Sequence, residues 1–113
     1  MNLEFFRNIV LNLPEVEECQ PFGDDVLVYK TRKKIFLMMN FNYPLELTVK
    51  CQPEVSLELR ERYDSITPAY HMNKKHWITI ASDGSVPLEQ IIFLIKNSYK
   101  LVRIKNDCSH RYG

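Results

Sequence analysis

Apolar residues recur at helical spacing in two segments that precede residue 64. In residues 2–13 they fall three or four positions apart, Asn2 can cap the first turn, and Pro14 opposes further extension. A shorter amphipathic pattern follows Pro53, a residue well suited to the first turn of a helix. We predict helices over residues 2–13 and 53–63.

The strongest helical pattern lies near the C-terminus. It begins at Ser85 or Val86, has Pro87 in its first turn, and keeps apolar residues on one side as far as Val102. The last segment, residues 106–113, lacks apolar periodicity, and chain ends without such anchoring are commonly frayed. We therefore predict a long C-terminal helix followed by a frayed tail.

Four runs have the composition of β-strands. They are residues 25–30, 35–41, 45–50 and 77–81, and the short breaks between the first three favour antiparallel hairpins. In residues 45–50 apolar and polar side chains alternate, which places one face of the strand against a core and the other in water. The sheet should therefore be solvated on one side.

The remaining segments are interpreted as connections. Residues 15–25 are polar and contain Pro21 and Gly23, so we predict a surface connection there, and residues 66–75 are predicted to approach the last strand irregularly. The expected order is α-β-β-β-α-β-α. It corresponds to an α+β fold of two layers, in which the helices cover one face of an antiparallel sheet.

Length and composition fit one domain spanning residues 1–113. The chain has 113 residues, 45% of them hydrophobic and 26% charged, and a core of this size would be marginal if it were split. Its apolar stretches fall well short of the about 20 residues that cross a bilayer. The N-terminus also lacks the basic start and cleavage site of a signal peptide. We expect a cytoplasmic protein that does not interact with membranes.

The cysteine and histidine pattern does not indicate a metal or cofactor site. Cys19, Cys51 and Cys108 are far apart and odd in number, which fits neither a disulfide framework nor a CxxC site. His71 and His76 lack a second close pair of ligands, so a zinc site is a poor interpretation. We predict free thiols, no metal and no cofactor.

Motifs for catalysis are absent from the sequence. Gly23, Gly84 and Gly113 are isolated, and neither a phosphate-binding loop nor a GxSxG nucleophile motif occurs. The acidic run within residues 15–18 is typical of a solvated face. We therefore predict a protein that is not an enzyme. Because spatially assembled sites leave no such motif, an enzyme or ligand-binding module stays open as the weakest alternative.

Charge is distributed unevenly along the chain. The formal net charge is +1, which argues against strong nonspecific binding of polyanions. Residues 1–25 nevertheless contain several acidic residues and a single basic one, Arg7, so the rest of the chain is distinctly basic. Arg32, Lys33 and Lys34 fall at the predicted tip of a hairpin. Basic side chains there can follow a nucleic-acid backbone, although a solvated turn is the ordinary interpretation.

A second basic cluster precedes the last predicted strand. Lys74 and Lys75 can contact phosphates, and Trp77 can stack on an exposed base. The side chains that can reach a base edge are those of His71, Asn73 and His76. Core packing is nevertheless the favoured interpretation of Trp77, because it begins an apolar strand, and the histidines can equally hydrogen-bond a turn.

Three sequence blocks carry a family resemblance. They are Pro21-Phe22-Gly23, Lys50 followed by Pro53-Glu54, and the series Pro-Ala-Tyr-His-Met-Asn-Lys-Lys-His-Trp over residues 68–77. In their order along nearly the whole chain they resemble the MmcQ/YjbR family. The resemblance implies a YjbR-like two-layer domain with an antiparallel sheet, similar to type III secretion chaperones and frataxin-like folds. It also implies a double-wing mode of DNA binding, and it implies no defined catalytic residues.

Two functional hypotheses follow from these patterns. In the first, the protein is a monomer that binds DNA. Its expected contact residues are Arg32, Lys33, Lys34, His71, Asn73, Lys74, Lys75, His76 and Trp77. In the second, it is an adaptor that receives a protein partner on its sheet or on its acidic N-terminal edge. The net charge favours the adaptor, and the basic clusters favour DNA binding.

Overall fold

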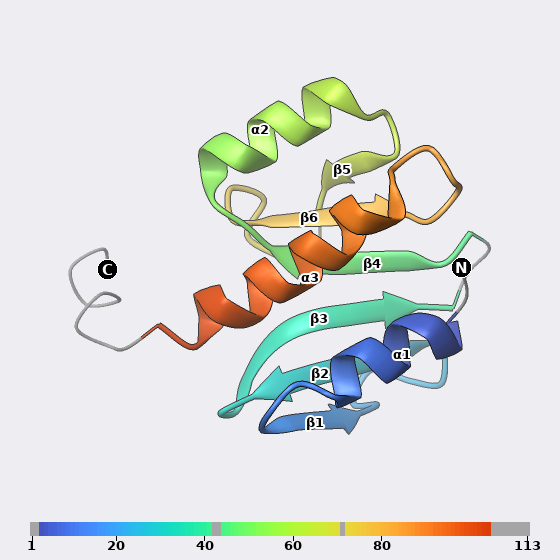
Figure 1. Cartoon of the computed structure of the whole chain (residues 1–113), viewed down its shortest axis with the longest axis vertical. Coiled ribbons are helices and arrows are strands. Elements are labelled where there is room, and N and C mark those ends of the chain that lie inside the picture. The colour runs from blue at the N-terminus through green and yellow to red at the C-terminus, as the bar shows by residue number, and fades with distance from the viewer. Residues whose placement is uncertain (1–2, 42–43, 71, 105–113) are drawn as a thin grey trace.

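The computed structural model of the chain describes residues 3–41, 44–70 and 72–104. Within these ranges the helices are α1 Leu3–Leu11, α2 Pro53–Arg62 and α3 Leu88–Val102. The strands are β1 Val16–Cys19, β2 Val26–Thr31, β3 Lys34–Asn40, β4 Glu46–Lys50, β5 Ile66–Pro68 and β6 Trp77–Ala81. The order along the chain is therefore α-β-β-β-β-α-β-β-α, as Figure 1 shows.

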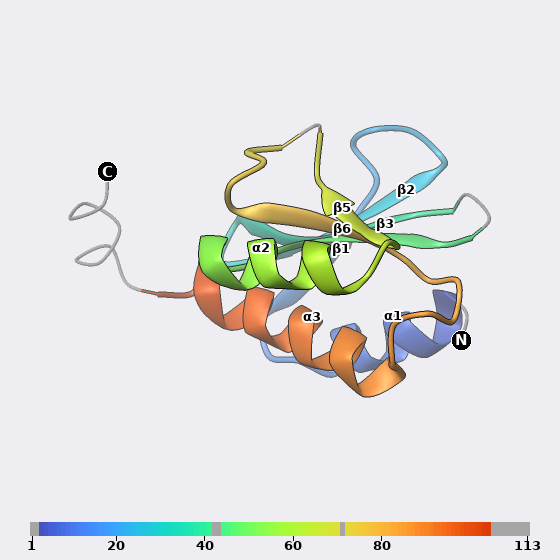
Figure 2. The ribbon, with the colours of Figure 1, turned by 90° about the horizontal axis from the view of Figure 1, so that it is seen from above.

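The strands form one antiparallel sheet in the order β1-β2-β3-β4-β6-β5. All three helices lie on one side of this sheet, and two loops rise on the other side (Figure 2). The predicted α+β class, with two layers and helices on one face, is confirmed. We call the side of the sheet without helices the open face.

Alternation along the strands builds the core. In β4, Leu47 and Val49 are fully buried against the helices, whereas Glu46, Thr48 and Lys50 belong to the open face and are partly exposed. Buried side chains from the helices include Phe6, Val10, Leu59, Ile91, Leu94, Ile95 and Val102. The expected solvation of one face of this strand is confirmed.

The two edge strands were missed by the sequence prediction. β1 lies within residues 15–25, and β5 lies within residues 66–75, so the predictions of connecting segments there were wrong for these strands. Short strands with charged residues, such as Glu17 and Glu18 in β1, are common at sheet edges. Pro68 is tolerated in β5 because an edge strand leaves some of its N–H groups unpaired. Neither strand has the apolar alternation by which strands are recognised.

The predicted helices are present with shifted ends. The helix expected over residues 2–13 ends at Leu11. The C-terminal helix begins at Leu88, because Pro87 has an extended backbone (φ −57°, ψ 141°) and occupies the N-cap position. Residues 106–113, which were predicted to be frayed, lie outside the described residues.

A polar network joins α1 to the sheet. Arg7 donates two hydrogen bonds to the Glu18 carboxylate, from Nε at 2.7 Å and from Nη2 at 3.0 Å. The buried Tyr29 hydroxyl donates to the same carboxylate at 2.6 Å. The hydrogen bonds from Arg7 lower the pKa of Glu18, and burial raises the pKa of Tyr29. The interpretation of residues 15–18 as a solvated acidic face was therefore wrong for Glu18.

Ser98 of α3 completes the hydrogen bonding where β3 and β4 separate. A β-bulge shifts the β2–β3 register after Tyr29, and the β3–β4 pairs end at Leu37 and Val49. Beyond that point the buried Ser98 hydroxyl donates to the Phe36 carbonyl at 2.6 Å and accepts from the Lys50 N–H at 2.9 Å. One side chain thus satisfies two backbone groups that the strands no longer pair.

Two of the cysteines lie in the described part of the chain. Cys19 and Cys51 carry free thiols there, and Cys108 lies outside it. Burial raises the pKa of the Cys51 thiol to about 11, so this thiol remains protonated at neutral pH. Among the described helices, none is long and apolar enough to cross a membrane.

Candidate nucleic-acid interface

Strand register brings the two predicted basic clusters to the same end of the sheet. The β2–β3 hairpin turns within residues 31–34, at the start of β3. Antiparallel pairing of β3 with β4, and of β4 with β6, places Lys50 opposite Trp77 at that same end. The β5–β6 turn with Lys74 and Lys75 immediately precedes Trp77. We call this end, with Lys30, Arg32, Lys33, Lys34, Lys50, Lys74 and Lys75, the basic end.

Acidic residues gather at the opposite end of the sheet. Strand directions place there the residues that precede β2 and β5, begin β4 and follow β6. They are Asp24, Asp25, Asp64, Glu46 and Asp83. At the basic end, Glu15 and Glu17 flank the β1 edge. The sheet is therefore electrically polarised along its strands, and a polyanion is attracted to one end of it.

The β2–β3 hairpin presents its basic residues on a tight turn. Arg32 and Lys33 have consecutive positive φ angles of 52° and 68°, the combination found in two-residue type I′ hairpins. Arg32, Lys33 and Lys34 are all exposed. The turn thus projects three basic side chains into solvent, as predicted from its position at a hairpin tip.

Arg103 fixes this hairpin to the end of α3. Its guanidinium donates to the Thr31 hydroxyl at 2.6 Å and to the Glu15 carboxylate at 2.8 Å. Arg32 approaches the same carboxylate at 3.4 Å. The hydrogen bond from Arg103, followed by the charge of Arg32, lowers the pKa of Glu15. Arg32 is therefore partly neutralised, whereas Lys33 makes no ion pair with a described residue.

Asn73 shapes the turn between β5 and β6. Its Oδ1 accepts the Lys75 N–H at 2.9 Å, and its carbonyl accepts the N–H groups of His76 and Trp77, each at 3.0 Å. Lys74 and Lys75 are exposed, and Lys74 Nζ lies 5.1 Å from the centre of the Tyr70 ring. Asn73 thus organises the turn that presents both lysines, and its Oδ1 is already engaged by the backbone.

Trp77 occupies a different position from the one favoured by its sequence context. Ile78 and Ile80 are fully buried on the helix side, so the alternating Trp77 and Thr79 belong to the open face. The interpretation of Trp77 as a core residue was therefore wrong, and the indole is partly exposed beside Lys50. His76 is partly buried, and His71 lies outside the described residues.

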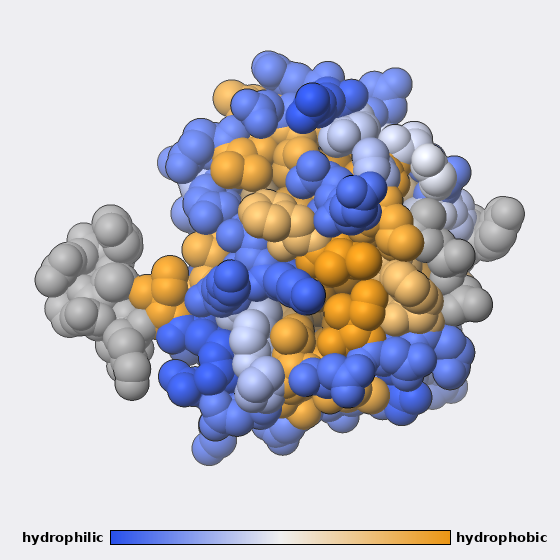
Figure 3. All heavy atoms as spheres, in the orientation of Figure 1, coloured by the Kyte–Doolittle hydropathy of each residue, from blue (hydrophilic) through white to orange (hydrophobic). Residues whose placement is uncertain are grey.

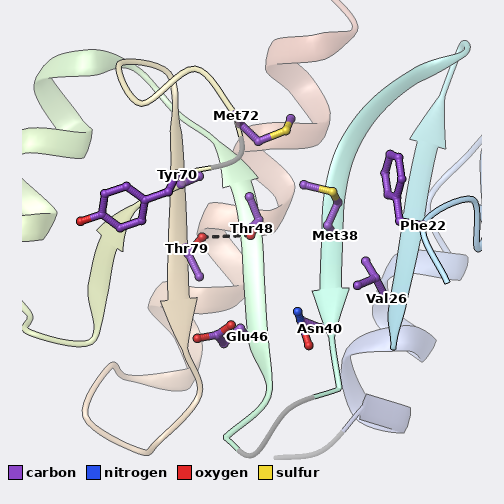
Figure 4. Close-up of a pocket in the computed structure, with 10 residues that line it drawn as sticks. Phe22, Val26, Met38, Asn40, Glu46, Thr48, Tyr70, Met72 and Thr79 are labelled. Atoms are coloured by element: carbon purple, nitrogen blue, oxygen red, sulfur yellow. Dashed lines mark hydrogen bonds between the residues drawn. The ribbon is translucent and has the colours of Figure 1, made fainter. Parts of the chain in front are cut away.

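A cleft of about 590 Å³ lies on the open face. Its floor comes from three strands, with Met38 of β3, Thr48 of β4 and Thr79 of β6 (Figure 4). The two threonine hydroxyls are hydrogen-bonded to each other at 3.0 Å. Asn40 and Glu46 line the cleft toward the acidic end of the sheet. The floor thus combines a thioether with hydroxyl, amide and carboxylate groups.

Two loops form the walls of the cleft. Phe22 comes from the β1–β2 loop, and Tyr70 and Met72 come from the β5–β6 loop. Both loops rise from the open face, and they stand apart from each other, one at the left and one at the right in Figure 2. The aromatic side chains are 63% exposed for Phe22 and 67% exposed for Tyr70. Gly23 has a φ of +110°, a value that side-chain-bearing residues rarely adopt, so a glycine is favoured immediately after Phe22.

The residues that line the cleft were not among the predicted site residues. Phe22, Tyr70 and Met72 belong to two of the sequence blocks that carried the family resemblance, and this membership was an available signal. Met38 and Thr79 gave no such signal, because half-exposed positions that alternate with core positions are found in any sheet that has one solvated face. Their assembly depends on pairing between strands far apart in the sequence.

Residues 3–41, 44–70 and 72–104 contain no group of three or more His, Cys, Asp or Glu side chains that could hold a metal ion.

The sequence profile of the YjbR family matches residues 11–101, a span that includes every described strand and both loops of the cleft. The chain belongs to the YjbR family. The resemblance drawn from three short sequence blocks is thereby confirmed. In this YjbR-family protein, the blocks at residues 21–23 and 68–77 supply the loops on the two sides of the cleft.

Relatives and solved structures agree with this assignment. The Escherichia coli O157:H7 protein YbdF, named as uncharacterised, is 38% identical over 101 residues, which cover 88% of this chain and 82% of YbdF. The crystal structure of Deinococcus radiodurans DR2400 is similar with a TM-score of 0.89 at 37% identity, covering 93% of this chain and 80% of that one. A Pseudomonas syringae protein has a TM-score of 0.79 at 27% identity, with 91% and 100% covered. The fold is thus shared with these two solved structures.

Proposed function

We propose that this YjbR-family protein binds DNA through the basic end of its sheet and acts without catalysis. The observation that carries the proposal is the strand register, which brings the β2–β3 hairpin and the β5–β6 turn to one end. Two basic clusters at opposite ends would have to act separately. At one end they can contact successive phosphates of the same backbone, which is the sequence-independent part of nucleic-acid binding.

The lysines of the basic end are available for such contacts. Among the described residues, the ion pairs join Arg7 to Glu18, and Arg32 and Arg103 to Glu15. Lys33, Lys34, Lys74 and Lys75 therefore make no ion pair with a described carboxylate, whereas Lys30 lies opposite Glu17 across the β1–β2 pair. β3 and β6 are two strand spacings apart, about 10 Å, so the turns are close enough to follow one backbone. The double-wing mode implied by the family resemblance supports the same arrangement.

A salt titration of DNA binding tests the proposal. Lys74 and Lys75 are both replaced by Ala in one variant, and Lys33 and Lys34 in another, while Arg32 is kept because Glu15 holds it. Fluorescence anisotropy with duplex DNA is measured between about 50 and 200 mM salt. Each variant should bind more weakly to unrelated sequences. The slope of log affinity against log salt should flatten by about 0.9 for every phosphate that the variant no longer neutralises.

The matched control removes two lysines from the helix side. Lys96 and Lys100 are exposed on α3, and their replacement by Ala changes the net charge by the same amount. This control should keep the slope of the wild type. Slopes that are unchanged in the two test variants, or that change as much in the control, would contradict binding at the basic end.

A protein-interaction adaptor is the second candidate, and exposed apolar side chains of the helices favour it. Phe5, Leu11 and Phe93 are 38%, 40% and 59% exposed. Figure 3 shows hydrophobic side chains gathered between α1 and α3. A surface of this kind can receive a partner helix. Wild-type protein that does not bind DNA in the titration would favour the adaptor.

A further inference from the structure

We infer that the cleft on the open face receives one unpaired nucleotide, so that the protein binds single-stranded DNA more tightly than duplex DNA. The inference rests on the proposed function, because the backbone of the same strand would be held by the basic end. It assigns a role to Phe22, Tyr70 and the polar floor of the cleft, none of which contacts phosphates in the proposal above.

Charge along the open face orients such a nucleotide. Glu46 and Lys50 lie on the same side of β4, four residues apart and therefore about 13 Å from each other. Lys30 and Trp77 lie at the same end of the sheet as Lys50, and Asn40 lies opposite Glu46 at the other end. A phosphate is attracted toward Lys50 and repelled by Glu46. The base must consequently point toward Glu46 and Asn40.

The cleft offers stacking surfaces for that base. Phe22 stands on the loop at one side, and Met38 and Met72 add polarisable thioethers, whereas the Tyr70 ring at the other side points outward beneath Lys74 (Figure 4). Aromatic side chains that are largely exposed in the free protein have the most surface to bury when a base covers them. Stacking of this kind accepts every base, because every base has a π face.

Hydrogen-bonding groups on the floor can contact the edge of the base. The Glu46 carboxylate can accept from the exocyclic amine of cytosine, and the Asn40 amide can pair with adenine. The hydroxyls of Thr48 and Thr79 can donate or accept. Bases with an exocyclic amine therefore fit this floor better than thymine does.

A duplex cannot use these groups. In double-stranded DNA each base is stacked on its neighbours and its pairing edge is occupied, so it enters a protein cleft only after it is unstacked and unpaired. Sequence-tolerant single-strand binders combine basic grooves with aromatic stacking. The open face of this sheet brings both features together.

The first experiment compares three probes of the same sequence with the full chain: a single strand, its duplex, and a single strand with abasic positions. Trp77 is the one tryptophan in the sequence and lies on the open face, so its fluorescence reports directly on this surface. We expect the single strand to bind at least tenfold tighter than the duplex and to quench Trp77. Removing the bases should weaken binding about five- to hundredfold, the range for the removal of one stacked base.

The outcomes separate this inference from the proposed function. Equal binding of all three probes would overturn the cleft assignment and leave phosphate binding at the basic end intact. Failure of every probe to bind would overturn both. A mononucleotide that binds as tightly as the strand would also overturn the assignment to a strand, because it would show that the backbone contributes nothing.

A matched pair of variants completes the test. Phe22→Ala removes a phenylalanine that is 63% exposed beside the cleft, and Phe93→Ala removes one that is 59% exposed on α3. We expect Phe22→Ala to weaken single-strand binding about five- to hundredfold with the salt slope unchanged, and Phe93→Ala to leave binding unchanged. Equal losses of affinity in both variants, or no loss in Phe22→Ala, would overturn the inference.

Discussion

The two faces of the sheet are built from the same strands but differ in what covers them. On the helix side of β4, Leu47 and Val49 are fully buried beneath the helix layer. On the open face of the same strand, Glu46, Thr48 and Lys50 remain partly exposed and are flanked by loops. Adjacent residues of one strand thus experience different surroundings. Side chains on the helix side must fit together in the core. Side chains on the open face can instead be polar or charged.

This difference predicts that substitutions on the helix side affect stability, whereas substitutions on the open face affect binding. A buried side chain touches neighbours on all sides, so its removal leaves a cavity. A half-exposed polar side chain packs against few neighbours, and when it is shortened water replaces some of its hydrogen bonds. The open face can therefore change its side chains at small cost to the fold.

The largest expected effect comes from substituting neighbouring residues of β4. Leu47→Ala should lower the free energy of unfolding by about 3 kcal/mol, because it leaves a cavity in the core. Thr48→Ala should lower it by about 1 kcal/mol or less, through removal of the hydrogen bond to Thr79. Urea denaturation of both variants provides the measurement. Similar decreases in the two variants would show that the faces do not differ as described.

An intermediate effect on stability is expected for Ser98, whose buried hydroxyl hydrogen-bonds the backbone of two strands. Ser98→Ala removes the hydroxyl that bridges the Phe36 carbonyl and the Lys50 N–H, and it leaves both backbone groups without this partner. We expect a decrease of about 2 kcal/mol in the free energy of unfolding. Hydrogen exchange of the Lys50 amide should also become faster.

The exposed neighbour Lys96 on α3 supplies the control for this substitution. Lys96→Ala should change the free energy of unfolding by less than about 0.5 kcal/mol. If Ser98→Ala were as mild as Lys96→Ala, the bridge between the strands would not contribute to stability.

Local patterns account for much of the fold and less of the site. Residues 77–81 were predicted with the observed bounds because an apolar, β-branched run is bordered by turn residues. β1 was missed because Glu17 and Glu18 interrupt any apolar alternation, and Glu18 lies partly buried beside Arg7 and Tyr29, each eleven positions away. A partner so distant in sequence cannot be found from the periodicity of a strand.

The candidate site shows the same limit. The hairpin tip at residues 32–34 could be located because charge and turn position are both local properties. Trp77 was assigned to the wrong face, because an apolar run does not state which of its alternating positions meets the helices. The shared end of the two basic clusters follows from the pairing of β3, β4 and β6, which the sequence does not specify.

The smallest expected effect compares the two faces within β1. Glu18 on the helix side accepts hydrogen bonds from Arg7 and Tyr29, whereas Glu17 is exposed on the open face opposite Lys30. Glu18→Gln should lower the free energy of unfolding by about 1 kcal/mol at neutral pH, because it removes a charge-assisted pair. Glu17→Gln should change it by less than about 0.5 kcal/mol.

The effect of Glu18→Gln should also depend on pH. The pKa of Glu18 is lowered in the folded state, chiefly by the hydrogen bonds from Arg7, so its stabilisation is present above the pKa of the unfolded chain and is lost as pH falls through the folded pKa. The difference between wild type and Glu18→Gln should therefore be largest at neutral pH and should shrink below a pH of about 4. Urea denaturation at several pH values measures this difference. A difference that persists unchanged in acid would mean that the carboxylate charge does not stabilise the contact between α1 and the sheet.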